Sequence, residues 1–248
     1  MNFIGIIPAR YASTRFPGKP LVDINGKSMI QRVYEQASKA IEHVVVATDD
    51  ERILKHVEDF GGKVVMTSDK HRSGTDRCAE AIRKIQPDFP DMKFDVVINI
   101  QGDEPFIQPE QLRLLKSCFE EDISIATLAK PISLPDELFN PNVVKVIVNR
   151  NNRALYFSRS VIPYQRNAEQ SDWIHSFQYL KHIGIYAYKV TVLKEITQLP
   201  PSPLEIAESL EQNRWLENEY AIYVQTTNME TIAIDTPEDL EKIKNMHV

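Results

Sequence analysis

The sequence has little of what marks a secreted, disulfide-bonded or membrane-spanning protein. Its two cysteines, Cys78 and Cys118, are too few for a disulfide framework and fit a reducing cytoplasm. No stretch approaches the roughly 20 apolar residues that a membrane-spanning helix needs. The first apolar run, Phe3 to Ile7, is too short for a signal peptide, and no charged segment precedes it. We therefore expect a cytoplasmic protein that is not inserted in a membrane.

A general excess of basic residues is also absent. The chain has a net charge of −6, whereas a general nucleic-acid binder usually needs a basic surface. The histidines are too scattered to show the ligand spacing of a zinc site. With 248 residues and 42% hydrophobic content, the chain can bury one large core, or a core and an attached lobe.

The first 20 residues combine a strand with a cationic loop. The run from Phe3 to Ile7 is rich in β-branched residues and is followed by Pro8, which predicts a buried strand closed by the proline. The loop after it has three cations, two hydroxyls and no acid, namely Arg10, Ser13, Thr14, Arg15 and Lys19. Because these cations repel one another, an anion such as a triphosphate would hold them together. On residue types alone, a solvated basic loop is an equally good interpretation.

Strands and helices alternate through the first half of the chain. We predict strands at 43–48, 63–66 and 94–100, and helices at about 28–40, 51–60, 75–86 and 109–118. Asp49 and Asp50 are predicted to cap the second of these helices. This alternation predicts right-handed crossovers and a mostly parallel sheet with helices on both faces, which is a Rossmann-like α/β core.

The pattern changes after residue 122. Strand-like runs lie at 123–129, 143–148, 154–158 and 184–188, with a hairpin turn at 149–152 and a polar loop, or part of a lobe, at 165–178. A helix from Pro203 to about Asn218 is predicted to bury a stripe of Ile206, Leu210 and Leu216. Strands at 221–226 and 231–234 and a helix from Pro237 follow. We predict one domain, 1–248, with an inserted mixed-β lobe of roughly residues 130–220.

Two aspartates each follow a predicted strand. Asp103 comes after the strand at 94–100 and Asp235 after the strand at 231–234, and ligands bind at this edge of open α/β sheets. Since Thr236 already supplies a helix cap, Asp235 is free for another role. Two converging carboxylates suit Mg²⁺. A turn residue and a redundant capping acid remain alternatives, and Glu104 is expected to be structural.

Three widely separated motifs resemble those of one enzyme family. I-P-A-R-Y-A-S-T-R-F-P-G-K-P-L at 7–21, Q-G-D-E-P at 101–105 and I-D-T-P-E-D-L at 234–240 resemble sugar-activating cytidylyltransferases, in particular the 3-deoxy-manno-octulosonate (Kdo) cytidylyltransferases. The resemblance implies a Rossmann-like nucleotidyltransferase fold and Mg²⁺ held by Asp103 and Asp235. It also implies CTP phosphates bound by Arg10, Ser13, Arg15 and Lys19, with Arg10 and Lys19 stabilising charge on the transferred and leaving phosphates.

Further segments resemble the family's substrate contacts. Ser73-Gly-Thr-Asp-Arg77 resembles the segment beside cytosine and ribose, which makes Ser73, Gly74 and Thr75 candidate contacts, although a helix cap explains Ser73 equally well. The resemblance assigns the sugar-acid side of the pocket to Gln101, Arg159, His182, Tyr186, Glu211 and Gln212. Residues 167–176 show no family signal.

The resemblance implies cytidylyl transfer from CTP to the anomeric hydroxyl of Kdo, which yields CMP-Kdo and pyrophosphate for lipopolysaccharide synthesis. It also implies a homodimer formed through the second lobe, where Tyr156, Phe157, Leu204 and Trp215 would suit either a dimer surface or a core. A cytidylyltransferase for 8-amino-Kdo or N-acylneuraminate is the nearer alternative. A non-catalytic nucleotide-binding regulator is the more distant one, and it would be expected to lack Lys19 or a metal carboxylate.

Overall fold

The computed structural model describes residues 1–12, 16–120, 123–230, 234 and 236–244. The chain divides into two compact units. The first contains Met1–Arg113, Ala187–Thr197 and Glu230–Val248, and the second contains Leu114–Tyr186 and Gln198–Met229. Within the described residues, no helix combines the length and apolar character needed to cross a bilayer.

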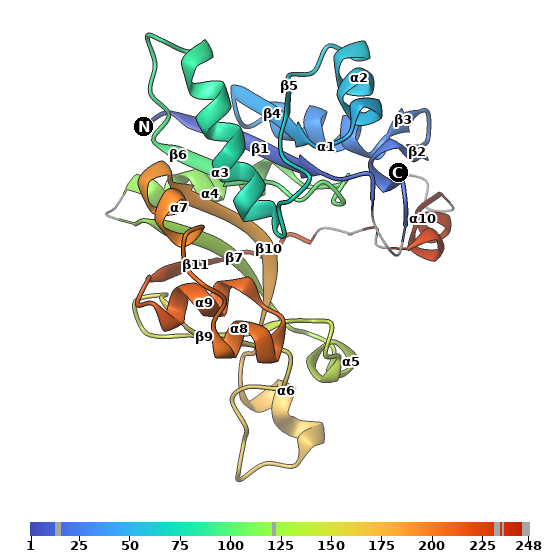
Figure 1. Ribbon diagram of the computed structural model, residues 1–248. Helices are drawn as coiled ribbons and strands as arrows, with labels where there is room; N and C mark the ends of the chain where they lie inside the picture. The colour runs from blue at the N-terminus through green and yellow to red at the C-terminus, as the bar shows by residue number, and fades with distance from the viewer. Residues whose placement is uncertain (13–15, 121–122, 231–233, 235, 245–248) are drawn as a thin grey trace. The chain divides into compact units, whose positions relative to one another are not determined.

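The first unit is built on parallel strands with helices packed against them (Figure 1). The strands β1 (Phe3–Ala9), β4 (His43–Thr48), β5 (Val64–Met66) and β6 (Val96–Asn99) lie in the order β6-β1-β4-β5, and all these pairings are parallel. A small hairpin, β2 (Asp23–Ile24) and β3 (Lys27–Ser28), precedes the first helix. The helices of this unit are α1 (Met29–Ser38), α2 (Glu51–Asp59), α3 (Gly74–Ile85), α7 (Val190–Ile196) and α10 (Pro237–Lys244). This arrangement confirms the predicted Rossmann-like core.

Burial along the strands shows why the sheet is covered on both faces. Successive residues of β4, Val44 to Ala47, are each at most 3% exposed, although their side chains alternate between the two faces. Local signals set the helix starts: Ser28 accepts from the N–H of Gln31, Asp50 from that of Arg52, and Ser73 from that of Asp76. The predicted helices in this unit are therefore confirmed, with small shifts at their ends.

Pro8 does not close the first strand, as the sequence had suggested, because β1 continues to Ala9. Pairing between β1 and β6 ends at Ile6 and Asn99, so a residue without an N–H interrupts no ladder with β6. Beyond the end of this pairing, the loop that follows β6 lies close to the backbone of β1. A Cβ at Gly102 would lie 2.8 Å from the carbonyl oxygen of Pro8, so only glycine fits there, and the 101–104 loop lies directly against β1.

The second unit contains the mixed sheet that the sequence predicts. Its strands are β7 (Ile125–Pro131), β8 (Lys145–Val148), β9 (Ala154–Ser158), β10 (Leu180–Lys189), which continues into the first unit, and β11 (Ile222–Thr226). β11 pairs with β7 in parallel, whereas β8 pairs antiparallel with β9 and β10. The 149–152 turn joins β8 to β9, and Asn152 adopts the positive φ (55°) that such turns favour. Helices α5 (Pro135–Phe139), α6 (Trp173–Ser176), α8 (Pro203–Glu208) and α9 (Glu211–Glu217) complete the unit, and α4 (Pro109–Ser117) spans its boundary with the first.

The single helix predicted from Pro203 to Asn218 is wrong. Ser209 takes a left-handed conformation with φ of 52° and separates α8 from α9. A capping box between Ser202 and Glu205 fixes the start of α8. The predicted apolar stripe is also wrong, because the break changes the helical phase and leaves Ile206 67% exposed while Leu210 is buried.

The 165–178 segment is organised around one aromatic side chain. Trp173 is 2% exposed, packs with Ile132, Leu138 and Tyr179, and donates from Nε1 to the carbonyl of Ala168. This burial stabilises the short helix α6, which the polar composition of the segment did not indicate. The strand predicted at 231–234 falls mostly outside the described residues, because 231–233 are not among them.

Candidate active site

Two predicted catalytic residues form an ion pair in the first unit. Lys19 Nζ donates to Asp103 Oδ2 at 2.8 Å, although the residues are 84 positions apart. Lys19 begins a short 3₁₀ turn after the N-terminal loop, and Asp103 lies in the loop after β6. Their side chains are 14% and 30% exposed, so the pair can meet a ligand. The structure thus joins them at the carboxyl edge of the parallel strands, where α/β folds bind ligands.

The two ends of the cationic loop are tied together. The N–H of Gly18 donates to the carbonyl of Tyr11 at 2.9 Å, and the φ of 73° at Gly18 suits glycine. The Arg52 guanidinium lies 3.3 Å from the centroid of the Tyr11 ring and forms two hydrogen bonds with the Asp50 carboxylate. Helix α2 therefore holds the start of the loop in place. Ser13 and Arg15, predicted phosphate contacts, lie outside the described residues.

Arg10 reaches the segment that leads into α3. Its Nη1 donates to the carbonyl of His71 at 3.4 Å, and the His71 ring is hydrogen-bonded to Glu80. Burial opposes ionisation of Glu80, yet hydrogen bonds from Lys84, the Ser68 N–H and His71 lower its pKa to about 2. Glu80 is therefore a carboxylate that anchors the 67–73 segment and, through it, the position of Arg10.

Asp49 does not cap α2 as the sequence had suggested, because Asp50 does. Instead, Asp49 Oδ2 accepts from Nη2 of Arg77 at 2.6 Å. Arg77 is 1% exposed, and its Nη1 donates to Thr67 Oγ1 at 2.6 Å. This buried arginine ties the ends of β4 and β5 to α3. Its place in the S-G-T-D-R motif was the only sequence signal for it.

The N-terminus of α3 faces the end of β6. Ser73 is its N-cap, as the alternative interpretation held, and its predicted base contact stays a prediction. A Cβ at Gly74 would lie 3.4 Å from Pro8 and 3.6 Å from Asn99 Nδ2, and Thr75 is 3% exposed. Asn99 is 4% exposed, and its Oδ1 has no hydrogen-bond partner among the described residues. The sequence reasoning missed Asn99, which offers a free acceptor beside a helix N-terminus.

The C-terminal segment returns to Asp103. The N–H of Ile234 donates to the carbonyl of Asp103 at 2.9 Å, and Ile234 is fully buried against Ile24 and Met29. The predicted helix cap at Thr236 is confirmed, and it forms a capping box, since Thr236 and Asp239 each accept from the other's backbone N–H. Asp235 itself lies outside the described residues.

In the second unit, Arg159 is anchored by Glu208. Arg159 Nε donates to the carbonyl of Glu208 at 2.8 Å, and its backbone N–H donates to the Glu208 carboxylate at 2.9 Å. Burial opposes ionisation of Glu208, but hydrogen bonds led by the Arg159 N–H lower its pKa. The guanidinium is thereby oriented, with Nη1 on the carbonyl of Pro141 at 3.1 Å. The structure does not relate this arginine to Gln101, which belongs to the first unit.

His182 and Tyr186 lie together on β10. Their ring centroids are 5.2 Å apart, and Thr127 Oγ1 is 3.0 Å from His182 Nε2. The Thr127 hydroxyl also donates to the carbonyl of Ile185 at 2.7 Å. Its oxygen therefore accepts a hydrogen bond from His182, in the tautomer with the N–H at Nε2. Burial lowers the pKa of His182 to about 3, so its ring is neutral near pH 7.

Tyr186 joins β10 to the predicted contacts on α9. Burial, reinforced by the Glu211 carboxylate, raises the pKa of Tyr186 well above its ordinary value. Glu211 accepts from Arg214 Nη2 at 2.8 Å, and the adjacent Gln212 is 6% exposed. The structure thus brings three predicted sugar contacts near one another: the neutral side chains of His182 and Tyr186, and Glu211, which is paired with Arg214.

A model of the family described as "Cytidylyltransferase" matches residues 4–232. The chain belongs to this family. It is 62% identical over 247 residues, covering 98% of this chain and 96% of the relative, to a 3-deoxy-manno-octulosonate cytidylyltransferase of Parabacteroides distasonis. A relative of the same name from Bacteroides thetaiotaomicron is 61% identical over 97% of this chain and 96% of its own length. The family predicted from the motifs is therefore confirmed.

Solved structures agree with this assignment. A structure of CMP:2-keto-3-deoxy-manno-octonic acid synthetase complexed with CTP superposes with a TM-score of 0.89 at 45% identity, covering 98% of this chain and 97% of the other. A putative glucose-1-phosphate thymidylyltransferase of Bacillus anthracis matches with a TM-score of 0.64 at 16% identity, over 98% of this chain and 94% of the other, which shows the shared fold alone. The predicted nucleotidyltransferase fold and enzyme class are confirmed.

The site suits a divalent cation shared with a nucleotide. Within the described ranges no group of three or more His, Cys, Asp and Glu side chains is placed to hold a metal. Mg²⁺ needs no such group, since it takes one or two protein carboxylates together with phosphate oxygens and water. Of the two Asp103 carboxylate oxygens, Oδ2 is held by Lys19, which orients the group without burying it. The oriented carboxylate of Asp103 in this cytidylyltransferase therefore fits such an ion.

Proposed function

We propose that the protein transfers a cytidylyl group from CTP to the anomeric hydroxyl of Kdo, giving CMP-Kdo and pyrophosphate. The observation that carries the proposal is the convergence of Lys19 and Asp103, two residues of separate family motifs, at the carboxyl edge of the sheet. Close similarity over the whole chain to 3-deoxy-manno-octulosonate cytidylyltransferases supports the choice of substrates. CTP is also the ligand named with the similar solved structure.

The chain supplies the groups that nucleotidyl transfer requires. Arg10, Ser13, Arg15 and Lys19 bind the phosphates of CTP in this proposal, and Arg10 and Lys19 stabilise charge on the transferred and leaving groups. Lys19 acts from a prepared position, because its ammonium is already held next to Asp103. The N-terminus of α3, with Ser73, Gly74 and Thr75, lies against the cytosine and ribose. The acceptor oxygen of Asn99 can receive a hydrogen bond from that side of the nucleotide.

We assign Mg²⁺ to Asp103 and Asp235. Two observations support this assignment: Asp235 belongs to the I-D-T-P-E-D-L motif, and its sequence neighbour Ile234 donates its N–H to the carbonyl of Asp103 at 2.9 Å. The bound ion would polarise the α-phosphate and lower the pKa of the attacking hydroxyl. Lys19 and Asp103 position that chemistry, since their pairing fixes the carboxylate before substrate arrives.

The sugar acid is recognised in this proposal by the second unit and Gln101. Arg159 faces the carboxylate of Kdo, because its planar fork matches that group. His182, Tyr186, Glu211 and Gln212 serve the hydroxyls. With the pKa of His182 at about 3 and that of Tyr186 raised, both side chains stay neutral and act as hydrogen-bond partners. An 8-amino-Kdo or N-acylneuraminate acceptor is the alternative.

We further propose a homodimer that uses the second unit, in a cytoplasmic enzyme of lipopolysaccharide synthesis. Among the residues that the structure describes, and apart from Met1, the large apolar side chains that are exposed all belong to this unit, at Leu134, Phe139, Leu155, Tyr164, Phe177, Leu204 and Ile206. Phe157 and Trp215 are at most 1% exposed and belong to the core instead. Both cysteines are buried thiols, which suits a reducing compartment.

The function is tested by pyrophosphate release with purified protein. Each of the four nucleoside triphosphates is combined in turn with Kdo, its 8-amino analogue and N-acetylneuraminate, with and without Mg²⁺. We expect release only with CTP, Kdo and the metal together. A clear preference for the amino analogue would move the protein to the alternative acceptor, and no release with any pair would favour a non-catalytic nucleotide binder.

A further inference from the structure

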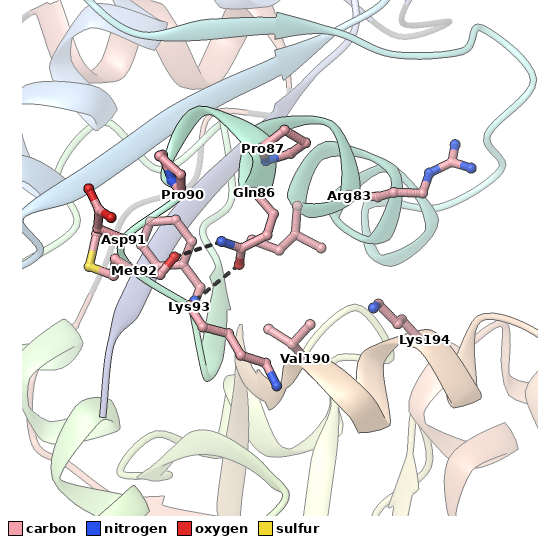
Figure 2. Close-up of a pocket in the computed structure, with 11 residues that line it drawn as sticks. Arg83, Gln86, Pro87, Pro90, Asp91, Met92, Lys93, Val190 and Lys194 are labelled. Carbon is pink, nitrogen blue, oxygen red and sulfur yellow. Dashed lines mark hydrogen bonds between the residues drawn. The ribbon is translucent and has the colours of Figure 1, made fainter.

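A cavity lies away from the candidate active site. It has a volume of about 550 Å³ and is lined by the C-terminal end of α3, the segment from Gln86 to Phe94 and α7 (Figure 2). All of these elements belong to the first unit. The volume lies within the usual range of small-molecule pockets, about 300–1,000 Å³.

The wall of this cavity is held in shape by a single glutamine. Gln86 Nε2 donates to the carbonyl of Met92 at 2.7 Å, and Gln86 Oε1 accepts from the N–H of Phe94 at 3.1 Å, as Figure 2 shows. The apolar lining that a ligand can reach consists of Pro87, Pro90, Met92 and Val190, which are exposed or partly exposed, whereas Ile82 and Phe94 are at most 1% exposed. The cavity is therefore a preformed apolar hollow.

Cations surround the hollow. Arg83, Lys93 and Lys194 are lining residues, against one acid, Asp91. None of the three cations forms an ion pair with another residue in the part of the chain that the structure describes. Figure 2 shows Lys93 and Lys194 on either side of Val190, whereas Asp91 lies at the far side of the view from Lys194. In a chain with a net charge of −6, this uncompensated positive charge beside apolar surface favours an anion with an apolar body.

The cavity is separate from the nucleotide site because the two lie at opposite ends of α3. Ser73 and Gly74 begin the helix, and Ile82 and Arg83 belong to its last turn. A helix of 12 residues is about 18 Å long, so one compact ligand does not span both ends. The residues assigned above to CTP do not line this cavity.

We propose that this cavity binds a small amphipathic anion, with its apolar body on Val190, Met92 and Pro87 and its carboxylate, phosphate or sulfonate between Lys93 and Lys194. The proposal does not depend on the cytidylyl transfer proposed above. Its test uses binding alone, so that either proposal can fail without the other.

The probe is 8-anilinonaphthalene-1-sulfonate, titrated by fluorescence into the full chain with CTP and Mg²⁺ present at saturation to occupy the nucleotide site. We expect one saturable site that CTP does not displace. Val190→Trp, which fills the hollow, should weaken binding at least about tenfold, and Lys93→Glu with Lys194→Glu should do the same through charge reversal on exposed side chains. Lys55→Glu, an exposed lysine on α2, is the matched control and should leave the affinity unchanged.

The charge requirement is tested with N-phenyl-1-naphthylamine, which has a similar apolar body and no sulfonate. We expect it to bind at least about tenfold more weakly than the sulfonate and to be insensitive to the lysine reversals. Circular dichroism verifies that each variant is folded. If the double reversal leaves the affinity for the sulfonate unchanged, or if the uncharged probe binds equally well, the cavity is not an anion site.

Discussion

The two units place their candidate functional groups in opposite electrostatic settings. At the carboxyl edge of the first unit, the side chains are ionised and paired, as in Lys19 with Asp103 and Arg77 with Asp49. Along β10 of the second unit, His182 and Tyr186 are kept neutral by burial. The carboxyl edge of the first unit is organised by ion pairs, whereas these two side chains of β10 take part as neutral groups.

This difference matches the chemistry of the two proposed substrates. A triphosphate carries several charges, and oriented cations and a metal carboxylate can stabilise the further charge that develops during transfer. A sugar acid presents mainly hydroxyls, which neutral donors and acceptors recognise without the desolvation cost of an unpaired charge. The single cation assigned to the sugar side, Arg159, is oriented by Glu208.

The largest effect is expected from removing the buried arginine of the charged region. Arg77→Met should lower the free energy of unfolding by about 3–5 kcal/mol, because Asp49 and Thr67 would keep their buried polar atoms without their partner. Urea denaturation measures the change. Arg83→Met, on an exposed position of the same helix, is the control and should change stability by about 0.5 kcal/mol or less. Equal losses of unfolding free energy in the two variants would show that the buried Arg77–Asp49 pair contributes no more to stability than an exposed arginine does.

The next effect concerns the proposed metal carboxylate. Asp103→Asn should lower kcat by about 10²–10³-fold, since an amide keeps the shape but loses the charge that holds Mg²⁺. Pyrophosphate release under saturating Mg²⁺ measures it, with the melting temperature as a check on folding. Asp91→Asn, an exposed aspartate of the same unit, should retain full activity. Near-normal kcat in the Asp103 variant would remove this residue from the site.

A pH dependence distinguishes the neutral region. In the unfolded chain His182 titrates near its ordinary pKa of 6.5, whereas in the folded protein its pKa is about 3. Between these values the unfolded state binds more protons, so the His182 contribution to stability is complete above about pH 6.5 and is lost as the pH falls toward 3. The slope is at most about 1.4 kcal/mol per pH unit.

Urea denaturation at pH 7.5 and pH 5 tests this expectation. His182→Asn should flatten the loss of stability between the two values, whereas His175→Asn, at an exposed histidine, should preserve it. The pKa of Glu80 falls from 4.5 to about 2, so its own contribution is lost below this pH window. An unchanged slope in the His182 variant would show that the ring titrates normally in the fold.

The smallest effect is expected at the edge of the cationic loop. Arg52→Ala removes the guanidinium from the Tyr11 ring, a contact worth about 0.5–1 kcal/mol at an exposed site. We expect a two- to fivefold rise in KM for CTP with kcat unchanged, because the loop is less well ordered but its cations remain. Lys55→Ala on the same helix is the control. A fall in kcat at unchanged KM would contradict this positioning role.

Much of the first unit could be predicted because its signals are local. Ser28, Asp50 and Ser73 cap the helices as their positions in the sequence suggest, and the β-branched runs form the expected parallel strands. The second unit was harder to predict from the sequence. The break at Ser209 and the burial of Trp173 depend on packing, so the predicted long helix and the plain polar loop differ from the structure.

Candidate residues that lie in motifs were easier to predict than the residues that hold them in position. Lys19 and Asp103 lie in recognisable motifs, and the structure pairs them. Asn99 and Arg52 have no pattern that separates them from ordinary helix or strand residues, and only the S-G-T-D-R motif marks Arg77. Their roles arise from contacts between residues far apart in the sequence, such as Arg77 and Asp49, which are 28 positions apart.

By itself, the sequence determined the order of strands and helices, the helix caps and the family motifs, because these depend on residues near one another in the chain. Only the tertiary structure decided which charges meet and which side chains lose their charge. The Lys19–Asp103 pair and the neutral His182 are examples. The physical reason is that ion pairing and desolvation depend on distance and burial in space, which separation along the chain does not specify.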